Sequence, residues 1–503
     1  MALDRLVQVS SSRAVTATPN RSGGKGRCLA QGQTSELSLG ELICRTCISR
    51  QAGHREQGEE NPGVDGEVWD TPDLKAAAVQ RIARVRGYLP KPLKRKYIAK
   101  SNGKQRPLSI PVMEDRGRQA VHLQALSPIA ETLADLNSYG FRSKRQCADA
   151  IDQCFKILRQ TTSATVIYEG DIAGFFDNID FSWIEENIPM DKRLLSKWLR
   201  SGYMEEEAFY PTTQGVPQGG LISPVIGNMT LDGLEQVVRG KTEWFRRKHN
   251  INFVRYADDF IITANNNEVL QQLTPQIEAF LDERGVSLSK EKTKITHISE
   301  GFDFLGQNVR KHVRANGQLG KIQITPSKAS FQRVIEKVKL LTKRHRGATP
   351  KVLIEKLNPV LRGWANYHRH VICGETFGKL DSYVWGRLYR WCKRRHPDKT
   401  GRWIAERYFL NRGSHKWRFT DPGTGTSLIK VAEEVKHKRH VKIRSAANPF
   451  DPEWDTYFED RDRKQVFTLT AAFTAKVYMV QDGICPGCRQ LIQHDEETVL
   501  YHR

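Results

Sequence analysis

The sequence predicts an α+β fold in which an antiparallel sheet is covered by helices and is followed by a helical block. Residues 253–262, Phe-Val-Arg-Tyr-Ala-Asp-Asp-Phe-Ile-Ile, place two carboxylates between two apolar, β-branched runs, which is typical of a hairpin with an acidic tip. Upstream, the apolar strand expected at residues 166–170 ends at Asp171. Downstream, Leu357, Leu361, Trp364 and His368 recur at spacings of four, three and four, which forms one face of a helix.

The acidic residues carry the strongest indication of chemistry. Asp258 and Asp259 are adjacent on a short turn and repel one another unless a cation lies between them, so a divalent metal is the expected occupant. Asp171 offers a third carboxylate, and two-metal phosphoryl transfer needs about three carboxylates that hold ions roughly 4 Å apart. For the Asp-Asp pair alone, an ordinary solvated turn is the alternative.

Two further segments suit the binding of a phosphorylated substrate. Residues 214–224, Gln-Gly-Val-Pro-Gln-Gly-Gly-Leu-Ile-Ser-Pro, form a glycine-rich loop between the acidic motifs, where backbone can approach a base and its phosphates closely. Asn102-Gly103 is a strong hairpin signal. Lys100 and Arg106 flank this turn, so both are expected to project from one two-stranded finger and clamp a triphosphate.

Several motifs in a fixed order resemble those of a reverse transcriptase, in particular the protein encoded by a bacterial group II intron. Besides the acidic hairpin and the Gly-rich loop, they include residues 61–66 (Asn-Pro-Gly-Val-Asp-Gly), 97–111 and 137–142 (Asn-Ser-Tyr-Gly-Phe-Arg). Residues 290–294 (Lys-Glu-Lys-Thr-Lys) and 302–306 (Phe-Asp-Phe-Leu-Gly) resemble the motifs that follow, the last being the primer grip. The resemblance implies a right-hand polymerase, with fingers and palm over residues 61–320, that synthesises DNA on an RNA template with two Mg²⁺ ions.

The resemblance also implies individual roles. Asp171, Asp258, Asp259 and the backbone carbonyl of Ile172 would hold the metal, and Gln218 and Gly219 would lie beside the nucleotide. Phe176 takes the gate position, where an aromatic ring leaves no room for a ribose 2′-hydroxyl, so deoxynucleotides are the expected substrate; a plain core Phe is the alternative. Lys292 would protonate the departing pyrophosphate, although a Lys in a Lys-Glu-Lys run is often simply solvated.

Positive charge is concentrated in the later part of the chain. The formal net charge is +22, and residues 331–450 hold 28 Lys plus Arg against 9 Asp plus Glu, a net of +19 that leaves about +3 for the rest. Interleaved aromatic residues suit stacking on unpaired bases, while a helical domain with a solvated cationic face is the alternative. The tryptophans of this block are Trp364, Trp385, Trp391, Trp403 and Trp417.

Residues 361–367, Leu-Arg-Gly-Trp-Ala-Asn-Tyr, resemble the signature of the thumb and maturase domain of group II intron proteins, which implies a helical domain over residues 321–430 that grips intron RNA and assists its splicing. The expected RNA-binding residues are Arg362, Trp364, Asn366, Tyr367, Arg369, Lys393 and Arg394. Residues 431–475, with the Lys-rich stretch from Glu433 to Arg444, resemble a basic DNA-binding linker, and a charged solvated helix is the alternative.

The two ends depart from the family pattern. Cys485-Pro-Gly-Cys488 and His502, within residues 476–503, resemble the opening of an HNH endonuclease, a short zinc-module remnant. The sequence ends at Arg503 before a second Cys pair, so we expect no nuclease activity and weak or no Zn²⁺ binding. Residues 1–60 are expected to form a disordered, divergent extension, because Ser10 to Gln33 is rich in Ser, Thr, Gly and Gln with little periodicity.

The expected partners are group II intron RNA, an RNA template with a DNA primer, target DNA and deoxynucleotides. No apolar run approaches the length of a membrane span, and nine scattered Cys indicate reduced thiols, so we expect a bacterial cytoplasmic protein at the nucleoid, with an organelle as the alternative. Two other functions stay open at this point. One is a splicing cofactor or decayed mobile-element protein without polymerase turnover, and the other is a reverse transcriptase of another bacterial lineage.

Overall fold

The computed structural model describes residues 61–84, 86–99, 103, 105–240, 242–412 and 415–469. The expectations for residues 1–60, for Lys100 and for the Cys485, Cys488 and His502 set lie outside these residues. In the described part, no helix combines the length and the apolar character that crossing a bilayer requires.

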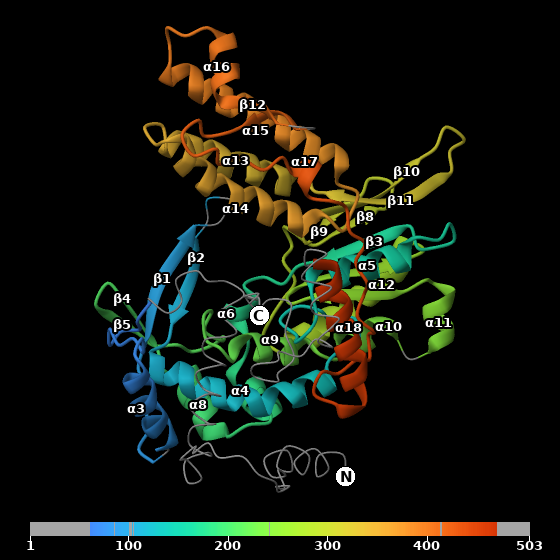
Figure 1. Cartoon of the computed structure of the whole chain (residues 1–503). Helices are drawn as coiled ribbons and strands as arrows, with labels where there is room; N and C mark the ends of the chain where they lie inside the picture. Colours follow the sequence, from blue (N-terminus) through green and yellow to red (C-terminus); the bar gives the residue numbers. More distant parts are fainter. Residues whose placement is uncertain are drawn as a thin grey trace, which may run out of the picture.

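The part of the chain expected to form the fingers begins with a helix and a four-stranded sheet of order β2-β1-β4-β5. Strands β1 (Leu93–Ala99) and β2 (Gln105–Ile110) pair antiparallel from Lys94↔Ile110 to Ala99↔Gln105, which confirms the hairpin predicted around Asn102-Gly103. The other elements here are α3 (Pro72–Ala83), α4 (Met113–Leu133), β4 (Tyr203–Glu205) and β5 (Ala208–Tyr210). In Figure 1 the β1–β2 hairpin stands on the opposite side of the molecule from β10 and β11.

The expected palm is an antiparallel sheet of order β6-β7-β3-β8. Its strands are β3 (Val166–Gly170), β6 (Asn252–Tyr256), β7 (Asp259–Ala264) and β8 (Lys294–His297). Both faces of the central strands are buried: Phe260 and Ile262 of β7 enter one apolar core, while Ile261 enters another. This two-sided burial explains why β7 reads as a nearly continuous apolar run rather than an alternating one.

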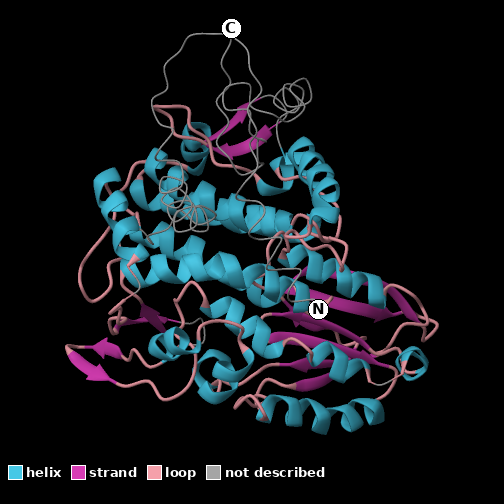
Figure 2. Cartoon of the chain, turned by 90° about the horizontal axis from the view of Figure 1, so that it is seen from below, coloured by secondary structure: helices cyan, strands magenta, loops and turns pink. Residues whose placement is uncertain are grey.

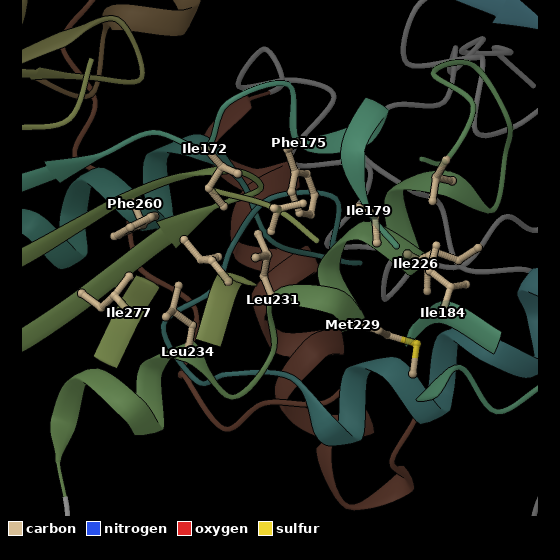
Figure 3. Close-up of a cluster of buried hydrophobic side chains, with 14 of the residues drawn as sticks. Ile172, Phe175, Ile179, Ile184, Ile226, Met229, Leu231, Leu234, Phe260 and Ile277 are labelled. Atoms are coloured by element: carbon tan, nitrogen blue, oxygen red, sulfur yellow. The ribbon is translucent and has the colours of Figure 1, made fainter. Parts of the chain in front are cut away.

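Helices cover this sheet and form the core beneath the end of β3. In Figure 3, Ile172, Phe175, Phe260 and Ile277 converge there from the β3 end, α6, β7 and α12. The helices of this part of the chain are α5 (Cys147–Leu158), α6 (Phe175–Asn178), α7 (Phe181–Asn187), α8 (Lys192–Leu199), α9 (Ser223–Leu231), α10 (Leu234–Arg239), α11 (Glu243–Lys248) and α12 (Asn267–Asp282), of which α5, α10 and α12 contact the sheet.

A second antiparallel sheet follows the palm, in the order β11-β10-β9. Its strands are β9 (Phe302–Phe304), β10 (Gln307–Val313) and β11 (Leu319–Pro326). The domain boundary predicted at residue 320 therefore falls inside β11, because this strand pairs with β10 through Gln307↔Pro326. The strand-bearing part of the chain extends to Pro326.

The helical block predicted downstream is present. It consists of α13 (Lys328–Arg344), α14 (Pro350–His368), α15 (Gly374–Arg395) and α16 (Gly401–Tyr408), with a hairpin of β12 (Phe409–Arg412) and β13 (His415–Phe419) and the short α17 (Val431–Glu434). Helix α14 begins after Thr349, whose hydroxyl caps it, with Pro350 in its first turn. Leu357, Leu361 and His368 are buried, which confirms the predicted inner face. Figure 1 shows this helical block above the palm. In Figure 2 the longest strands lie together, away from the small β12–β13 hairpin.

The segment predicted to be a basic DNA-binding linker does not form the solvated helix that was its alternative. Beyond α17, residues 436–444 contain no helix, and the chain returns to the palm, ending in η2 (Pro452–Trp454) and α18 (Asp455–Leu469). Buried Asp149 at the start of α5 accepts hydrogen bonds from His440, from the Ile443 backbone and from Arg461. We call residues 436–454 the return segment. Contacts with α5 hold the return segment in place, so this segment is not a solvated helix.

Gly170 permits the close pairing of β3 and β7, and this yields a test. A Cβ at position 170 would lie 2.2 Å from Cζ of Phe260, so Gly170→Ala must displace this buried ring. We expect the substitution to lower the free energy of unfolding by about 1–3 kcal/mol, as overpacking usually does. Urea denaturation measures it. Gly378→Ala on α15, where nothing lies within 4 Å, is the control and should be neutral or stabilising; equal stability of the two variants would contradict the packing described here.

Candidate active site

Strand pairing brings the acidic motifs together. The β3–β7 register ends at Gly170↔Phe260, and continuing it by one residue sets Asp171 opposite Asp259. Side chains that are directly opposite on antiparallel strands point to the same face, with Cβ atoms about 4.5–5.5 Å apart. Asp258 occupies the tip of the β6–β7 hairpin, between the paired residues Tyr256 and Asp259.

The hairpin tip is held in a strained and closely packed turn. Ala257 has a positive φ of 57°, which is uncommon for a residue with a Cβ. The backbone at Gly140 lies directly against this turn, and only Gly fits there because a Cβ at position 140 would lie 2.4 Å from the Ala257 nitrogen. Residues 137–139 run beside the hairpin: the Tyr139 backbone N–H donates to the Arg255 carbonyl at 2.9 Å, and the Arg255 N–H donates to the Asn137 carbonyl at 2.9 Å. The 137–142 motif therefore supports the hairpin that carries Asp258.

A buried ion pair beneath the hairpin was not foreseen from the sequence. Arg255 is fully buried and pairs with Asp232, while Asn228 accepts a further hydrogen bond from its guanidinium at 3.3 Å. Burial raises the pKa of Asp232 to about 6, although the charge of Arg255 opposes this. The only signal in the sequence is the single Arg within an apolar run.

The carboxylates interact electrostatically. Burial raises the pKa of Asp258, and the charge of Asp171 adds to this, whereas Arg106 and Lys292 oppose it. The pKa of Asp259 is raised to about 7 by burial, then by the charges of Asp258 and Asp171. Asp259 also retains exposed surface, so a solute can reach it. Carboxylates gathered at one place favour a cation between them.

Lys292 places a positive charge beside the carboxylates. Its Nζ lies 3.0 and 2.8 Å from the two carboxylate oxygens of Asp171. This hydrogen bond, followed by the charges of Asp171, Asp259 and Asp258, raises the pKa of Lys292. The lysine is therefore not simply solvated.

The donor set fits a divalent cation with oxygen ligands. The three carboxylates are hard oxygen donors. Ile172 and Leu288 form an isolated antiparallel bridge, in which the neighbouring residues make the hydrogen bonds: Ala173 donates to Ser287, and Ser289 donates to Asp171. No described residue donates a hydrogen bond to the Ile172 carbonyl oxygen. In the described part, no three His, Cys, Asp or Glu side chains already stand as ligands of one ion.

The Gly-rich loop lies against the short helix α6. Val216 donates a backbone hydrogen bond to Phe176, and Gly215 donates one to Ile179. The side-chain amide of Gln218 donates to both carboxylate oxygens of Asp177, at 3.3 and 3.4 Å. The backbone carbonyl of Gln218 accepts a hydrogen bond from the backbone N–H of Ser109 on β2. Gly219 has a φ of +126°, and a Cβ there would lie 2.5 Å from the Ser109 carbonyl oxygen. The loop is thus joined to both the β1–β2 hairpin and α6.

The two adjacent aromatic residues of α6 have different surroundings. Phe175 is 3% exposed and belongs to the palm core. Phe176 is only half-buried, with its ring 5.1 Å from that of Phe175, and Gly227 leaves space for it. The Phe176 ring is therefore partly accessible to solvent. Arg106 is exposed on β2 and interacts with Asp258 across the site.

The expected RNA-binding residues fall into two groups. Arg362, Asn366 and Tyr367 are exposed on α14, and Arg369 is half-buried just after it. Lys393 and Arg394 are exposed near the far end of α15, a helix about 33 Å long at 1.5 Å per residue. Lys393 also donates to the carbonyls of Pro397 and Lys399. The structure therefore does not bring all of these charges into one patch.

The tryptophans of the basic block are mostly structural. Trp391 is buried and donates to the His345 carbonyl, and half-buried Trp364 donates to Ser330. The expected stacking of Trp391 on a base is incompatible with this burial. Trp385 and Trp417 are exposed.

Helix α14 is joined to the turn between β9 and β10. The Tyr367 hydroxyl donates to the Leu305 carbonyl at 2.7 Å. Buried His368 lies between Gln307, at 3.0 Å, and Ser330, at 2.9 Å. The turn at residues 305–306 resembles the primer grip, so these contacts fix the helical block to it.

An antiparallel palm with three carboxylates at its strand ends, faced by a β-hairpin and followed by a helical bundle, defines the class of template-directed polymerases with an α+β palm. Comparison with known families agrees. Residues 98–309 match the family described as "Reverse transcriptase (RNA-dependent DNA polymerase)", and residues 331–409 match "Group II intron, maturase-specific domain".

Individual relatives point to the same family. Protein YkfC of Escherichia coli is 31% identical over 313 residues, which cover 53% of this chain and 80% of that protein. Group II intron-encoded protein LtrA of Lactococcus lactis is 31% identical over 303 residues, covering 47% of this chain and 50% of LtrA. A 91 kDa protein in the cob intron of Schizosaccharomyces pombe is 25% identical over 368 residues, covering 58% and 45%. The chain belongs to the group II intron reverse transcriptase and maturase family, and it spans about half the length of LtrA.

The burial of His368 predicts a dependence of stability on pH. Burial lowers its pKa from 6.5 to about 3. The unfolded chain therefore binds a proton that the folded chain does not, and stability present above pH 6.5 is lost as the pH falls from 6.5 toward 3. We expect this group to cost about 2 kcal/mol by pH 5.

Urea denaturation of the wild type and of His368→Gln at pH 7.5 and pH 5 measures this contribution. The wild type should lose about 2 kcal/mol more than the variant between the two values. Parallel losses in both proteins would mean that His368 is not held neutral at the junction with β10.

Proposed function

We propose that this chain is an RNA-directed DNA polymerase that also binds the RNA of its group II intron and assists splicing and mobility. The observation that carries the proposal is the placement of Asp171, Asp258 and Asp259 at adjoining strand ends, where burial and the charge of Asp171 raise the pKa of both Asp258 and Asp259. The membership of the chain in the family supports it.

Asp171, Asp258, Asp259 and the Ile172 carbonyl would hold two Mg²⁺ ions. When bound, such ions activate the attacking 3′-hydroxyl and neutralise the departing pyrophosphate. Lys292 has a raised pKa and is therefore protonated at neutral pH, which suits it to donate a proton to the pyrophosphate once it leaves Asp171. Arg106, together with Lys100, would bind the triphosphate from the β1–β2 hairpin.

The nucleotide's sugar and base would lie against the loop and α6. Gln218 and Gly219 line the approach from the loop, and the partly accessible ring of Phe176 would meet the 2′ position of the sugar. The ring is held in place by its contact with Phe175 and by the space at Gly227, so it cannot move aside without displacing the palm core. Deoxynucleotides are the proposed substrate.

RNA binding would come from the cationic surfaces of the helical block. Arg362, Asn366 and Arg369 line a cavity of about 340 Å³ together with Lys436 and Lys438. Lys393 and Arg394 would contact a separate part of the RNA, because they lie at the other end of α15. Template, primer and target DNA are proposed as further partners.

Sugar selection offers a direct test. Phe176→Ala or Phe176→Val should admit ribonucleotides while leaving deoxynucleotide extension largely intact, because only the contact with the 2′-hydroxyl changes. Loss of a steric contact of this kind is worth roughly 1–3 kcal/mol, or about 10- to 200-fold in discrimination. Primer extension with each nucleotide type measures the ratio. Unchanged discrimination with active enzyme would show that Phe176 is a core residue only.

RNA binding and polymerisation should be separable. Neutralising Arg362, Arg369, Lys393 and Arg394 to Gln should weaken binding to intron RNA and reduce the slope of log K against log salt by roughly 0.7 to 0.9 for each lost phosphate contact. Because the four residues form two surfaces, each pair should account for part of the change.

Asp258→Ala is the matched variant for the other function: it should keep RNA affinity and lose DNA synthesis. Filter binding across salt concentrations measures the RNA affinity, and primer extension on a short generic template measures DNA synthesis. An RNA affinity and slope equal to wild type in the neutralised variant would refute the maturase part of the proposal. Normal extension by Asp258→Ala would refute the polymerase part.

A further inference from the structure

Helix α4 carries two buried polar side chains, Asp115 and Gln119, which are 3% and 6% exposed. Residues four apart on a helix lie on the same face, so these two point the same way. Burying a polar group is unfavourable unless the group is hydrogen-bonded, so the partners of Asp115 and Gln119 show what α4 holds. Figure 1 shows that α4 begins at the foot of the β1–β2 hairpin. Neither residue was singled out from the sequence.

Asp115 holds the chain that leads into β1. The Tyr88 hydroxyl donates to one carboxylate oxygen of Asp115, and the Lys91 backbone N–H donates to the other at 3.2 Å. Trp198 of α8 donates to the same Tyr88 hydroxyl at 2.9 Å, which fixes its position. Burial raises the pKa of Asp115 to about 6, although the hydrogen bonds from Tyr88 and Lys91 oppose this. The carboxylate therefore anchors the chain just before Leu93, the first residue of β1.

The other strand of the hairpin is fixed to the same turn of α4 by the chain itself. Residues 111–112 alone separate β2 from α4. The Arg116 guanidinium donates to the Pro111 carbonyl at 2.9 Å, which holds this short connection against the helix. Both strands of the hairpin are therefore attached at the first turn of α4, β2 through the chain and β1 through Asp115.

Gln119 holds the Gly-rich loop. Its side-chain oxygen accepts a hydrogen bond from the Leu221 backbone N–H at 2.9 Å. A Cβ at position 220 would lie 3.1 Å from the same oxygen, so Gln119 lies directly against the loop at Gly220. The loop is also attached to the hairpin, because the Gln218 carbonyl accepts from the Ser109 N–H of β2 at 2.7 Å. The segment that follows Gln218 is therefore held by α4, and Gln218 itself by β2.

We propose that Asp115 and Gln119 are positioning residues for nucleotide binding, through which α4 sets the separation between the β1–β2 hairpin and the Gly-rich loop. The hairpin carries Arg106 and the loop carries Gln218, the two groups proposed to meet the nucleotide from opposite sides. One turn of helix, or about 6 Å, separates the two points of attachment on α4. Neither Asp115 nor Gln119 would touch the nucleotide. The inference rests on the proposed function, since it requires a nucleotide site between the hairpin and the loop.

Loss of either attachment should affect substrate binding more than the chemical step. A nucleotide that contacts both the hairpin and the loop must order any part that is free to move, and this cost reduces its affinity. Once the nucleotide is bound, both parts are ordered, so the later step is less affected. A change of this kind raises KM and leaves kcat nearly unchanged, whereas a general loss of structure reduces the amount of active enzyme.

The test is Gln119→Met, assayed by single-nucleotide primer extension over a range of deoxynucleotide concentrations. Met has about the length of Gln but offers no oxygen, so Leu221 loses its acceptor. We expect KM for the deoxynucleotide to rise roughly fivefold to thirtyfold, as loss of one such hydrogen bond implies. The value of kcat should change by less than about threefold. Gln119→Glu keeps an oxygen at the same reach and should restore most of the KM.

Two further variants complete the series. Asp115→Asn retains one acceptor oxygen for two donors, so either Tyr88 or Lys91 loses its partner, and KM should rise while kcat is kept. This variant carries the test if Gln119→Met does not fold. The control is Ser127→Ala on the same helix, which removes a buried hydroxyl that donates to the Leu123 carbonyl within α4. Its KM should equal that of the wild type.

Hydrogen exchange measures the attachment without relying on catalysis. The peptide that contains Leu221 should exchange at least about fivefold faster in Gln119→Met than in the wild type, because a hydrogen bond that limits local opening is lost. In Gln119→Glu and Ser127→Ala the exchange rate should stay close to that of the wild type.

The outcomes distinguish this inference from the proposed function. An active wild type with an unchanged KM in Gln119→Met and Asp115→Asn would overturn the positioning role and leave the polymerase proposal standing. Failure of Gln119→Glu to restore KM, or equal exchange of the Leu221 peptide in the wild type and Gln119→Met, would overturn it as well. A wild type that extends no primer would refute the proposed function, and this inference with it.

Discussion

Mutual repulsion among Asp171, Asp258 and Asp259 is the constraint on which this structure depends. Three acids at adjoining strand ends disfavour one another's charge, and folding alone gains nothing from bringing them together. The surrounding structure offsets this cost locally. Lys292 binds Asp171 through both carboxylate oxygens, and the buried pair of Arg255 with Asp232 anchors the hairpin from below. A cation at the site would take over the role that Lys292 has in its absence.

The second organising feature is the attachment of the helical block to the palm. Helix α14 reaches the turn after β9 through Tyr367 and His368, and the return segment closes the connection at Asp149 on α5. Asp149 and Ile443 are 294 residues apart in the chain. The proposed RNA-binding face of α14 is therefore joined directly to the turn that resembles the primer grip.

The parts of the fold with a local signal could be predicted from the sequence. The finger hairpin, the acidic hairpin and the inner face of α14 all follow from turn residues and periodicity within about ten residues. The ordering of the motifs identified the family. The family match and the relatives support that reading, whereas the roles of individual site residues stay predictions.

Features that depend on contacts between distant segments could not be predicted. The positive charge of the stretch from Glu433 to Arg444 left a solvated helix open beside a DNA-binding linker, but residues 436–444 form no helix and buried Asp149, far upstream in the sequence, binds His440 and Ile443 of this stretch. Trp391 resembled a stacking residue by composition and is instead core, because α15 turns it inward. The pairing of Lys292 with Asp171 and the burial of Arg255 likewise arise only when strands far apart in the chain meet.

The central claim is that the carboxylates form one cation site in which metal replaces the Lys292 ammonium. Crystallography of the chain with Mn²⁺ and a deoxynucleotide triphosphate, using anomalous scattering to locate the metal, tests it most directly. The account predicts anomalous density shared by Asp171 and the Asp258–Asp259 hairpin, with the Lys292 ammonium displaced from Asp171. An Asp171–Lys292 pair that stays intact at saturating Mn²⁺, with no anomalous density between the two acidic motifs, would contradict it.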